Sequence, residues 1–210
     1  MQEITGITPQ VKDKTRCNIF LDGKFYCGLK LEVVVKHRLK VGMKVEENFL
    51  SQIQLDSEKS VALDKTLTYI TATQKTEKQI RDYLYKKGYL STVVEYVLEK
   101  LRDYRFVDDK DYAETYAKSY ATRKGKRLIK MELYKKGIKK EEIESALNEV
   151  DEDTQIQTAS GLVEKYMRSK TPDRQTLAKA FRYLVSKGFD YDVAKKALEN
   201  YGELLEEGEE

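Results

Sequence analysis

A Lys-Gly pair that recurs three times along the chain constrains its fold more than any other feature of the sequence. The pairs lie in residues 84–89, 133–138 and 184–189, and their glycines are 49 and then 51 residues apart. Beyond each glycine, apolar residues return at the sixth, ninth, tenth and thirteenth positions, which places them on one face of a helix. The spacing excludes helical arrays with periods of about 33 or 34 residues. It predicts three repeats that each fold as a small helical unit.

Each of the three glycines is expected to end a preceding helix. Gly88, Gly137 and Gly188 should adopt the left-handed conformation that closes a helix, and the lysine before each opposes the negative end of the helix dipole. The residue that follows each glycine is apolar or aromatic, as suits the contact that often accompanies such a cap. These residues are Tyr89, Ile138 and Phe189.

Two further helices belong upstream of each glycine. The nearer helix carries an apolar residue eight positions before the glycine, at Ile80, Ile129 and Ala180. Its start is marked by Thr76 with Gln79 three residues later, and in the third repeat by Thr171 followed by Pro172. The more distant helices are expected at about 61–73, 108–123 and 152–169. Each repeat is therefore a three-helix unit, and neighbouring units should stack to complete their small cores.

The first sixty residues follow a different pattern. Asp22-Gly23 separates two β-prone runs and predicts a hairpin in which Leu21 pairs with Lys24. In that register Cys17 and Cys27 lie diagonally across the ladder, where they could approach each other, although nothing demands it. Residues 31–39 suit either a strand or a helix, and we favour a short helix before a turn at Gly42. Residues 46–56 are interpreted as a short helical or mixed segment, and residues 57–60 as a boundary.

The predicted fold is mainly α, with tandem three-helix repeats in an elongated array and a small N-terminal module that contains the β-hairpin. The expected divisions are an N-terminal module at 1–58, repeats at 60–106, 107–150 and 151–202, and an acidic tail at 203–210. No apolar run approaches the roughly 20 residues that cross a bilayer, and the first residues do not resemble a secretory signal. We therefore expect a cytoplasmic protein with reduced thiols.

The sequence offers no support for catalysis, a cofactor or a metal ion. Two cysteines and the single histidine, His37, cannot make a four-ligand zinc site. Gly125-Lys126 lacks the earlier glycine and the following hydroxyl residue of a phosphate-binding loop. Asp108 and Asp109 could form a metal pair, but a helix cap explains them better.

Charge is distributed unevenly along the chain. The whole sequence has a formal net charge of only +3, yet residues 75–140 contain 19 Lys/Arg against 10 Asp/Glu, while residues 141–210 contain 9 against 17. A basic middle is the pattern expected of a surface that meets phosphates or the acidic groove of a protein filament. The candidate partner- or DNA-binding residues are Arg81, Lys86, Lys87, Arg123, Lys124, Lys126, Arg127, Lys130, Lys135 and Lys136.

The densest part of this set lies at the start of the second helix of repeat two, between residues 123 and 130. Free N–H groups at a helix N-terminus would make these cations a good anion site. The alternative is that lysines near helix ends are ordinary solvated surface. Tyr85 and Tyr134, which precede equivalent Lys-Lys-Gly motifs, could stack on nucleobases, or could bury their rings and leave only the hydroxyls in water.

The residues from 106 to 138 resemble the core signature of the RecX family of bacterial recombination regulators. The similarity runs from the paired Asp108-Asp109, through the step at Tyr112-Ala113 and the basic turn of residues 123–129, to a Glu-Leu-x-x-Lys-Gly-Ile run that ends at Ile138. It extends over residues 60–202 as three repeats, and the first 58 residues resemble the N-terminal extension of many Gram-positive members. The third repeat departs from the pattern, with Val185-Ser186 in place of Tyr-Lys.

This resemblance implies a non-enzymatic protein that binds the RecA recombinase. It would lodge in the groove of the RecA–single-stranded-DNA filament and lower RecA's ATPase, strand-exchange and coprotease activities. Many members of the family also bind single- or double-stranded DNA, and a helical module that acts on DNA without RecA is the alternative. We expect a monomer that does not bind membranes.

Overall fold

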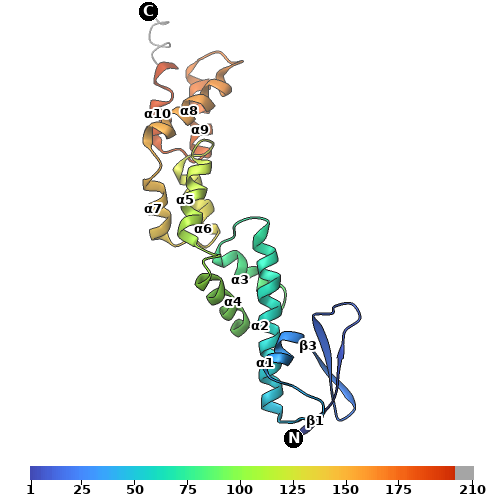
Figure 1. The fold of residues 1–210 in the computed structure, drawn as a ribbon. Coiled ribbons are helices and arrows are strands. Elements are labelled where there is room, and N and C mark those ends of the chain that lie inside the picture. The colour runs from blue at the N-terminus through green and yellow to red at the C-terminus, as the bar shows by residue number, and fades with distance from the viewer. Residues whose placement is uncertain (202–210) are drawn as a thin grey trace, which may run out of the picture. The chain divides into compact units, whose positions relative to one another are not determined.

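The computed structural model describes residues 1–201, so the predicted acidic tail at 203–210 lies outside the described residues. The described chain separates into two compact units, one of residues 1–74 and 80–106 and the other of residues 75–79 and 107–201. None of its helices combines the length and the apolar character that a bilayer span needs. Figure 1 shows a small sheet followed by helices only, which confirms a mainly α fold.

The first unit begins with a four-stranded antiparallel sheet in the order β3-β2-β1-β4. The Asp22-Gly23 hairpin is confirmed, because Leu21 pairs with Lys24 and both turn residues have positive φ. Sequence reasoning did not identify β1, which pairs with β2, or the short edge strand β4. The strands are β1 (Gln2–Pro9), β2 (Arg16–Leu21), β3 (Lys24–Lys30) and β4 (Lys44–Val45), and α1 (Leu31–Lys36) is the short helix predicted before Gly42.

No break in secondary structure marks residues 57–60, where the sequence suggested a boundary. A single helix, α2 (Glu47–Thr71), runs through that segment. The polar residues of this segment do not form a linker but bond to the sheet. Ser57 accepts a hydrogen bond from the Lys30 N–H at 3.2 Å, and Ser60 accepts one from Lys30 Nζ at 3.0 Å. The absence of glycine and proline between Gly42 and Gly88 was the signal for a continuous helix. The wider division into five segments stays a prediction.

The three-helix repeats form as predicted. Each Lys-Gly pair ends a helix, with φ of 83° at Gly88 and 88° at Gly137 and Gly188. In each repeat the N–H after the glycine donates to the carbonyl five residues back at 3.2 Å, which is the hydrogen bond of a Schellman cap. The helices of repeat one after α2 are α3 (Glu77–Lys86) and α4 (Ser91–Asp103); those of repeat two are α5 (Asp109–Tyr120), α6 (Lys126–Lys135) and α7 (Lys140–Asn148); those of repeat three are α8 (Glu152–Met167), α9 (Arg174–Ser186) and α10 (Tyr191–Lys196).

Helix starts agree with prediction in the first two repeats but not in the third. Thr76 and Gln79 exchange the two hydrogen bonds of a capping box, and Asp108 caps α5. Helix α9, however, begins at Arg174 and not at Pro172, because the Asp173 side chain accepts a hydrogen bond from the Thr176 N–H at 2.6 Å and fixes the N-cap there.

Within the second unit, the Lys-Gly caps also receive other segments of the chain. Thr76, which is fully buried, donates its hydroxyl to the Lys136 carbonyl at 2.7 Å, and the Glu77 N–H donates to Asp109 Oδ1 at 2.9 Å. The start of α3 is therefore held by the cap that ends α6 and by a side chain at the start of α5. We call this arrangement of Thr76–Glu77 with Asp109 and Lys136–Gly137 the first joint.

A second joint repeats the arrangement one period later. The Gly125 N–H donates to the Lys187 carbonyl and the Arg127 N–H to the Gly188 carbonyl, both at 3.0 Å, and the Lys126 N–H donates to Gln155 Oε1 at 3.0 Å. The start of α6 is thus held by the cap that ends α9 and by a side chain of α8. In both joints the N-terminal turn of a second helix is bonded to the Lys-Gly cap of the following repeat and to a side chain of that repeat's first helix.

Candidate partner-binding surface

The candidate cations do not form the anion site that sequence reasoning placed at the start of α6. The N–H groups of Gly125, Lys126 and Arg127 are all bonded in the second joint, to Lys187, Gln155 and Gly188 respectively. The helix N-terminus therefore has no free donors to offer a phosphate there. That part of the prediction is wrong, because the next repeat occupies the position that an anion would need.

Several candidates are held by interactions within the fold. Arg81 forms a two-point ion pair with Glu95, and Lys130 lies 3.4 Å from Glu144 Oε1. Lys126 is half-buried and lines a small cleft with the acidic residues Glu152, Asp190 and Asp192. The charges of these three side chains are at least partly neutralised in place.

Lys124 belongs to a compact polar cluster between α5 and α6. Its ammonium lies 2.7 Å from Glu132 Oε1 and 4.4 Å from the centre of the Tyr120 ring. The Tyr116 hydroxyl donates to Glu132 Oε2 at 2.9 Å. Burial of the Glu132 carboxylate tends to raise its pKa, but the hydrogen bonds from Lys124 and Tyr116 outweigh burial, and the pKa is lowered. Burial is the main cause of a raised pKa for Tyr116. At neutral pH Tyr116 is therefore protonated and Glu132 ionised, and their hydrogen bond links α5 to α6.

The lysine of each Lys-Gly pair covers a tyrosine ring. Lys87 lies 5.7 Å from the centre of Tyr83 and Lys187 lies 5.4 Å from that of Tyr183, each one helical turn back. In repeat two the equivalent position holds Glu132, and Lys136 instead covers Tyr116 at 5.4 Å and Tyr112 at 5.6 Å. These cation–π contacts give Lys87 and Lys136 a structural role.

The remaining candidates are exposed, and their side chains make no ion pair or hydrogen bond within residues 1–201. They are Lys86 at the end of α3, Arg123 in the turn before α6, and Arg127 and Lys135 on α6. Lys86 belongs to the first unit and the other three to the second. Arg123, Arg127 and Lys135 thus concentrate positive charge near one helix without a neutralising partner in the described chain.

Helix α6 also exposes two large apolar side chains among these cations. Tyr134 is 72% exposed and Met131 is 47% exposed, whereas Ile129 and Leu133 on the opposite side are fully buried. Of the two alternatives that the sequence left open for Tyr134, the buried ring is therefore not the one observed. We call the exposed side the α6 outer face; it consists of Arg127, Lys130, Met131, Tyr134 and Lys135.

Sequence reasoning did not single out Met131, although helical spacing could have found it. Positions 127, 131, 134 and 135 lie together on a helix whose core positions are 129 and 133. An exposed apolar pair ringed by cations is typical of a surface that binds a partner with both charged and planar or apolar groups.

The N-terminal cysteines and histidine serve the first unit's packing. Cys17 and Cys27 are buried free thiols, and burial raises the pKa of Cys27 to about 11, so it is a protonated thiol at neutral pH. His37 Nε2 lies 3.0 Å from Asp56 Oδ2 and its ring packs edge-on against Phe49. Among residues 1–201, no group of three His, Cys, Asp or Glu side chains is arranged to hold a metal ion.

Family models match four parts of the chain in the order that the fold suggests. The N-terminal domain of the regulatory protein RecX matches residues 2–46, and the first, second and third three-helix domains of RecX match residues 62–101, 108–147 and 153–198. The chain belongs to the RecX family. The α6 outer face lies within the second three-helix domain of that family.

Individual relatives agree with the RecX assignment along almost the whole chain. The regulatory protein RecX of Bacillus pumilus is 33% identical and the match covers 100% of this chain and 82% of the relative. That of Clostridium botulinum strain Eklund 17B is 32% identical, with 93% and 94% covered. A crystal structure of regulatory protein RecX superposes with a TM-score of 0.75 at 30% identity, covering 93% of this chain and 98% of that one. RecX from Lactobacillus salivarius gives a TM-score of 0.65 at 28% identity, covering 69% and 97%.

Proposed function

We propose that this protein regulates homologous recombination and DNA repair by binding in the groove of the RecA–single-stranded-DNA filament and inhibiting RecA. The relatives that span the chain are named regulatory proteins, which supports a regulator without catalytic activity of its own. The observation that carries the proposal is the α6 outer face, where Arg127 and Lys135 flank exposed Tyr134 and Met131. Such a regulator acts in the cytoplasm, as a monomer when dilute.

The physical basis is the charge that the fold leaves unneutralised. A filament groove presents nucleic-acid phosphates and acidic side chains, and Arg123, Arg127 and Lys135 have no ion-pair partner within the described residues. Arginine suits this role because its planar guanidinium binds phosphate or carboxylate at two points. The other candidates contribute less in this proposal, since the fold already engages Arg81, Lys87, Lys124, Lys130 and Lys136.

ATP hydrolysis by RecA on single-stranded DNA tests the proposal. Micromolar protein should lower the hydrolysis rate and strand exchange, and the triple variant Arg123→Ala, Arg127→Ala, Lys135→Ala should need at least tenfold more protein for the same effect. A matched control replaces three exposed cations of the third repeat, Lys165, Arg168 and Lys179, and removes the same charge. If the wild-type protein leaves hydrolysis and strand exchange unchanged, the proposed function is wrong.

A second candidate function is direct binding of DNA without RecA. The exposed Tyr134 ring favours it, because single-strand binders combine cations along the backbone with aromatic rings that stack on bases. In that case single-stranded DNA should bind tightly in the absence of RecA, and Tyr134→Ala should weaken DNA binding and RecA inhibition in parallel. Loss of RecA inhibition with unchanged DNA binding would favour the filament itself as the target.

A further inference from the structure

The two joints are built from the same three components. The first unit contains two of these components again, and there the third is missing among the described residues. In each filled joint, a Lys-Gly cap supplies carbonyl acceptors and the first helix of the same repeat supplies a side-chain acceptor, Asp109 or Gln155. The third component is the N-terminal turn of another second helix. Repeat one has a Lys-Gly cap of the same geometry at Lys87–Gly88, but among residues 1–201 no second helix supplies that turn to it.

The Gly88 cap is uncovered within the described chain. A Cβ built at Gly137 would meet Lys78 and one at Gly188 would meet Leu128, because a helix start lies on each of these caps. A Cβ built at Gly88 meets nothing within 4 Å. Gly88 is also exposed, and no hydrogen bond to its carbonyl or to that of Lys87 occurs within residues 1–201.

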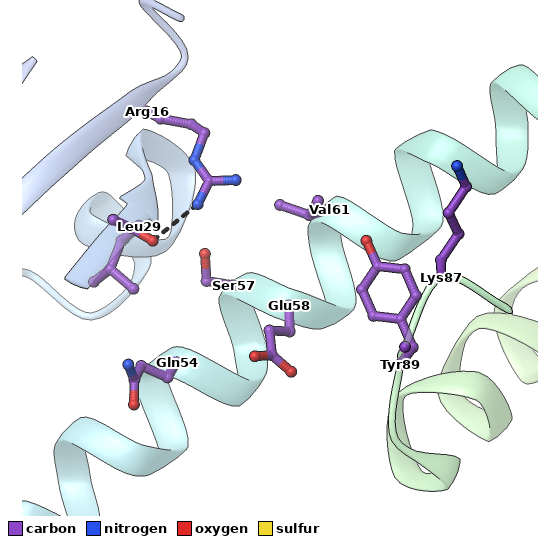
Figure 2. A pocket seen from close by; sticks show the side chains of 10 residues that line it. Arg16, Leu29, Gln54, Ser57, Glu58, Val61, Lys87 and Tyr89 are labelled. Carbon is purple, nitrogen blue, oxygen red and sulfur yellow. Dashed lines mark hydrogen bonds between the residues drawn. The ribbon is translucent and has the colours of Figure 1, made fainter. Parts of the chain in front are cut away.

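A cleft of about 340 Å³ lies beside this open cap. It is lined by Lys87, Gly88 and Tyr89, by Gln54, Ser57, Glu58 and Val61 of α2, and by Arg16, Gly28 and Leu29 of the sheet. Figure 2 shows Ser57, Glu58 and Val61 along α2, between Arg16 and the segment that carries Lys87 and Tyr89. Glu58 is the carboxylate on the first helix beside the cap, as Asp109 is in the first joint, so the cleft contains both acceptor components of a joint.

The matching donor component is the start of α9. Helix α9 corresponds to α3 and α6, since all three end at a Lys-Gly cap. The starts of α3 and α6 fill the two joints, whereas Asp173, which caps α9 through the Thr176 N–H, and Gln175 are exposed. Helix α9 also begins fourteen residues before its glycine, against eleven for the other two, so it reaches about 4.5 Å further. The empty cleft provides space for part of that extra turn.

The charges of the two ends are complementary. Arg16 and Lys87 bring two cations to the cleft. Asp173 carries the opposite charge and would pair with them. Opposite charges at a contact guide encounter and fix register.

We propose that the start of α9 in one molecule inserts into the Gly88 cleft of a second copy, which links molecules end to end through a third joint. When two different surfaces of identical chains bind each other, each bound molecule still offers both surfaces to further copies, so the association can continue into a linear array. A single joint buries far less than a standard interface, so it is weak in free solution and populated when copies lie in line on a common support. The proposal goes beyond the regulation of RecA and does not require it.

Disulfide trapping between two different single-cysteine additions tests this joint without RecA. Glu58→Cys and Asp173→Cys are made in separate molecules, and the native Cys17 and Cys27 are buried, which limits their oxidation. After mild oxidation at about 100 µM protein, the mixture should form crosslinked dimer at least fivefold faster than either variant alone. A control mixture of Glu58→Cys with Glu164→Cys, an exposed residue of α8, should stay at the background rate. Equal rates in the two mixtures would overturn the proposal.

A charge exchange provides an independent readout by sedimentation velocity. The wild-type sedimentation coefficient should rise with concentration between 10 and 500 µM, Lys87→Glu should abolish the rise, and Lys87→Glu combined with Asp173→Lys should restore it. Circular dichroism checks that each variant is folded. A wild-type coefficient that shows no rise over this range, or a double variant that behaves like Lys87→Glu, would contradict the joint.

Discussion

Gly125 lies directly on Gly188, so a Cβ at position 125 would overlap the backbone of Gly188 and Phe189. The N–H of Gly125 donates to the neighbouring Lys187 carbonyl at 3.0 Å, which holds the two segments at this distance. Two glycines from different repeats therefore allow the start of α6 to reach the cap of α9. The second joint depends on this close approach of two backbones.

Gly125→Ala should destabilise the second unit, because the added methyl meets backbone atoms that cannot move aside. The expected loss of unfolding free energy is about 2 kcal/mol, measured by urea denaturation. Gly161→Ala is the matched control, since a Cβ at Gly161 in α8 meets nothing within 4 Å. It should instead raise stability by about 0.5 kcal/mol, as alanine is the better helix former. A Gly125→Ala variant as stable as the wild type would show that the joint opens at little cost.

Gly188→Ala should cost more stability than Gly88→Ala. Both residues have positive φ, at 88° and 83°, so both substitutions carry the strain of a left-handed alanine, about 1 kcal/mol. Only at Gly188 would the new Cβ also collide with the backbone of Leu128. Thermal unfolding should therefore give a clearly lower Tm for Gly188→Ala. Equal Tm values would mean that the Gly188 cap is as open as the Gly88 cap.

The caps were predictable because their signal is local. A glycine after Lys, preceded and followed by helical apolar spacing, determines its own φ and its own hydrogen bonds, and all three caps formed as expected. Asp108 was predictable for the same reason, since an N-cap bonds only to its next few residues.

The joints were not predictable because they bring together residues that are far apart in sequence. Thr76 bonds to Lys136, sixty residues on, and Gln155 bonds to Lys126, twenty-nine residues back. Nothing local distinguishes Gln155, a polar residue near the start of a helix, from a solvated one. The same distant contacts explain why the start of α6 looked like an anion site. Six of the ten candidate cations are engaged or partly neutralised within the fold, some of them by nearer neighbours.

Gln155→Leu should destabilise the second unit by about 3 kcal/mol. Gln155 is only 2% exposed, and its amide accepts from the Lys126 N–H and donates to the Ala121 carbonyl at 2.9 Å. Leucine has a similar size but leaves the Lys126 N–H without its acceptor and removes the amide donor to the Ala121 and Lys124 carbonyls, of which Ala121 keeps the Thr158 hydroxyl at 3.3 Å. An unsatisfied buried group costs about 1–3 kcal/mol. Gln157→Leu, on the exposed side of α8, should change stability by less than about 0.5 kcal/mol. Similar losses for both variants would remove Gln155 from the joint.

Glu132 should make the stability of the second unit depend on pH. Its pKa is lowered in the folded state, since hydrogen bonds from Lys124 and Tyr116 outweigh the effect of burial. Its stabilisation is therefore complete above the ordinary glutamate pKa of about 4.3 and is lost as the pH falls through the lower folded value. Urea denaturation should show wild type more stable than Glu132→Gln at pH 7, with the difference shrinking as the pH falls below the ordinary glutamate pKa of about 4.3. Glu141→Gln, an exposed substitution on α7, should show no such trend.

Salt dependence should separate the exposed cations from those that the fold engages. If Arg127 and Lys135 each neutralise a phosphate, Arg127→Ala with Lys135→Ala should make the slope of log affinity against log salt shallower by about 1.4 for single-stranded DNA. Arg81→Ala with Lys87→Ala removes the same charge from side chains held by Glu95 and by the Tyr83 ring, and should change the slope by less than about 0.5. Fluorescence anisotropy with a labelled oligonucleotide between 25 and 200 mM salt measures both slopes. A larger change for the Arg81 and Lys87 variant would place the phosphate contacts on repeat one and away from the α6 outer face.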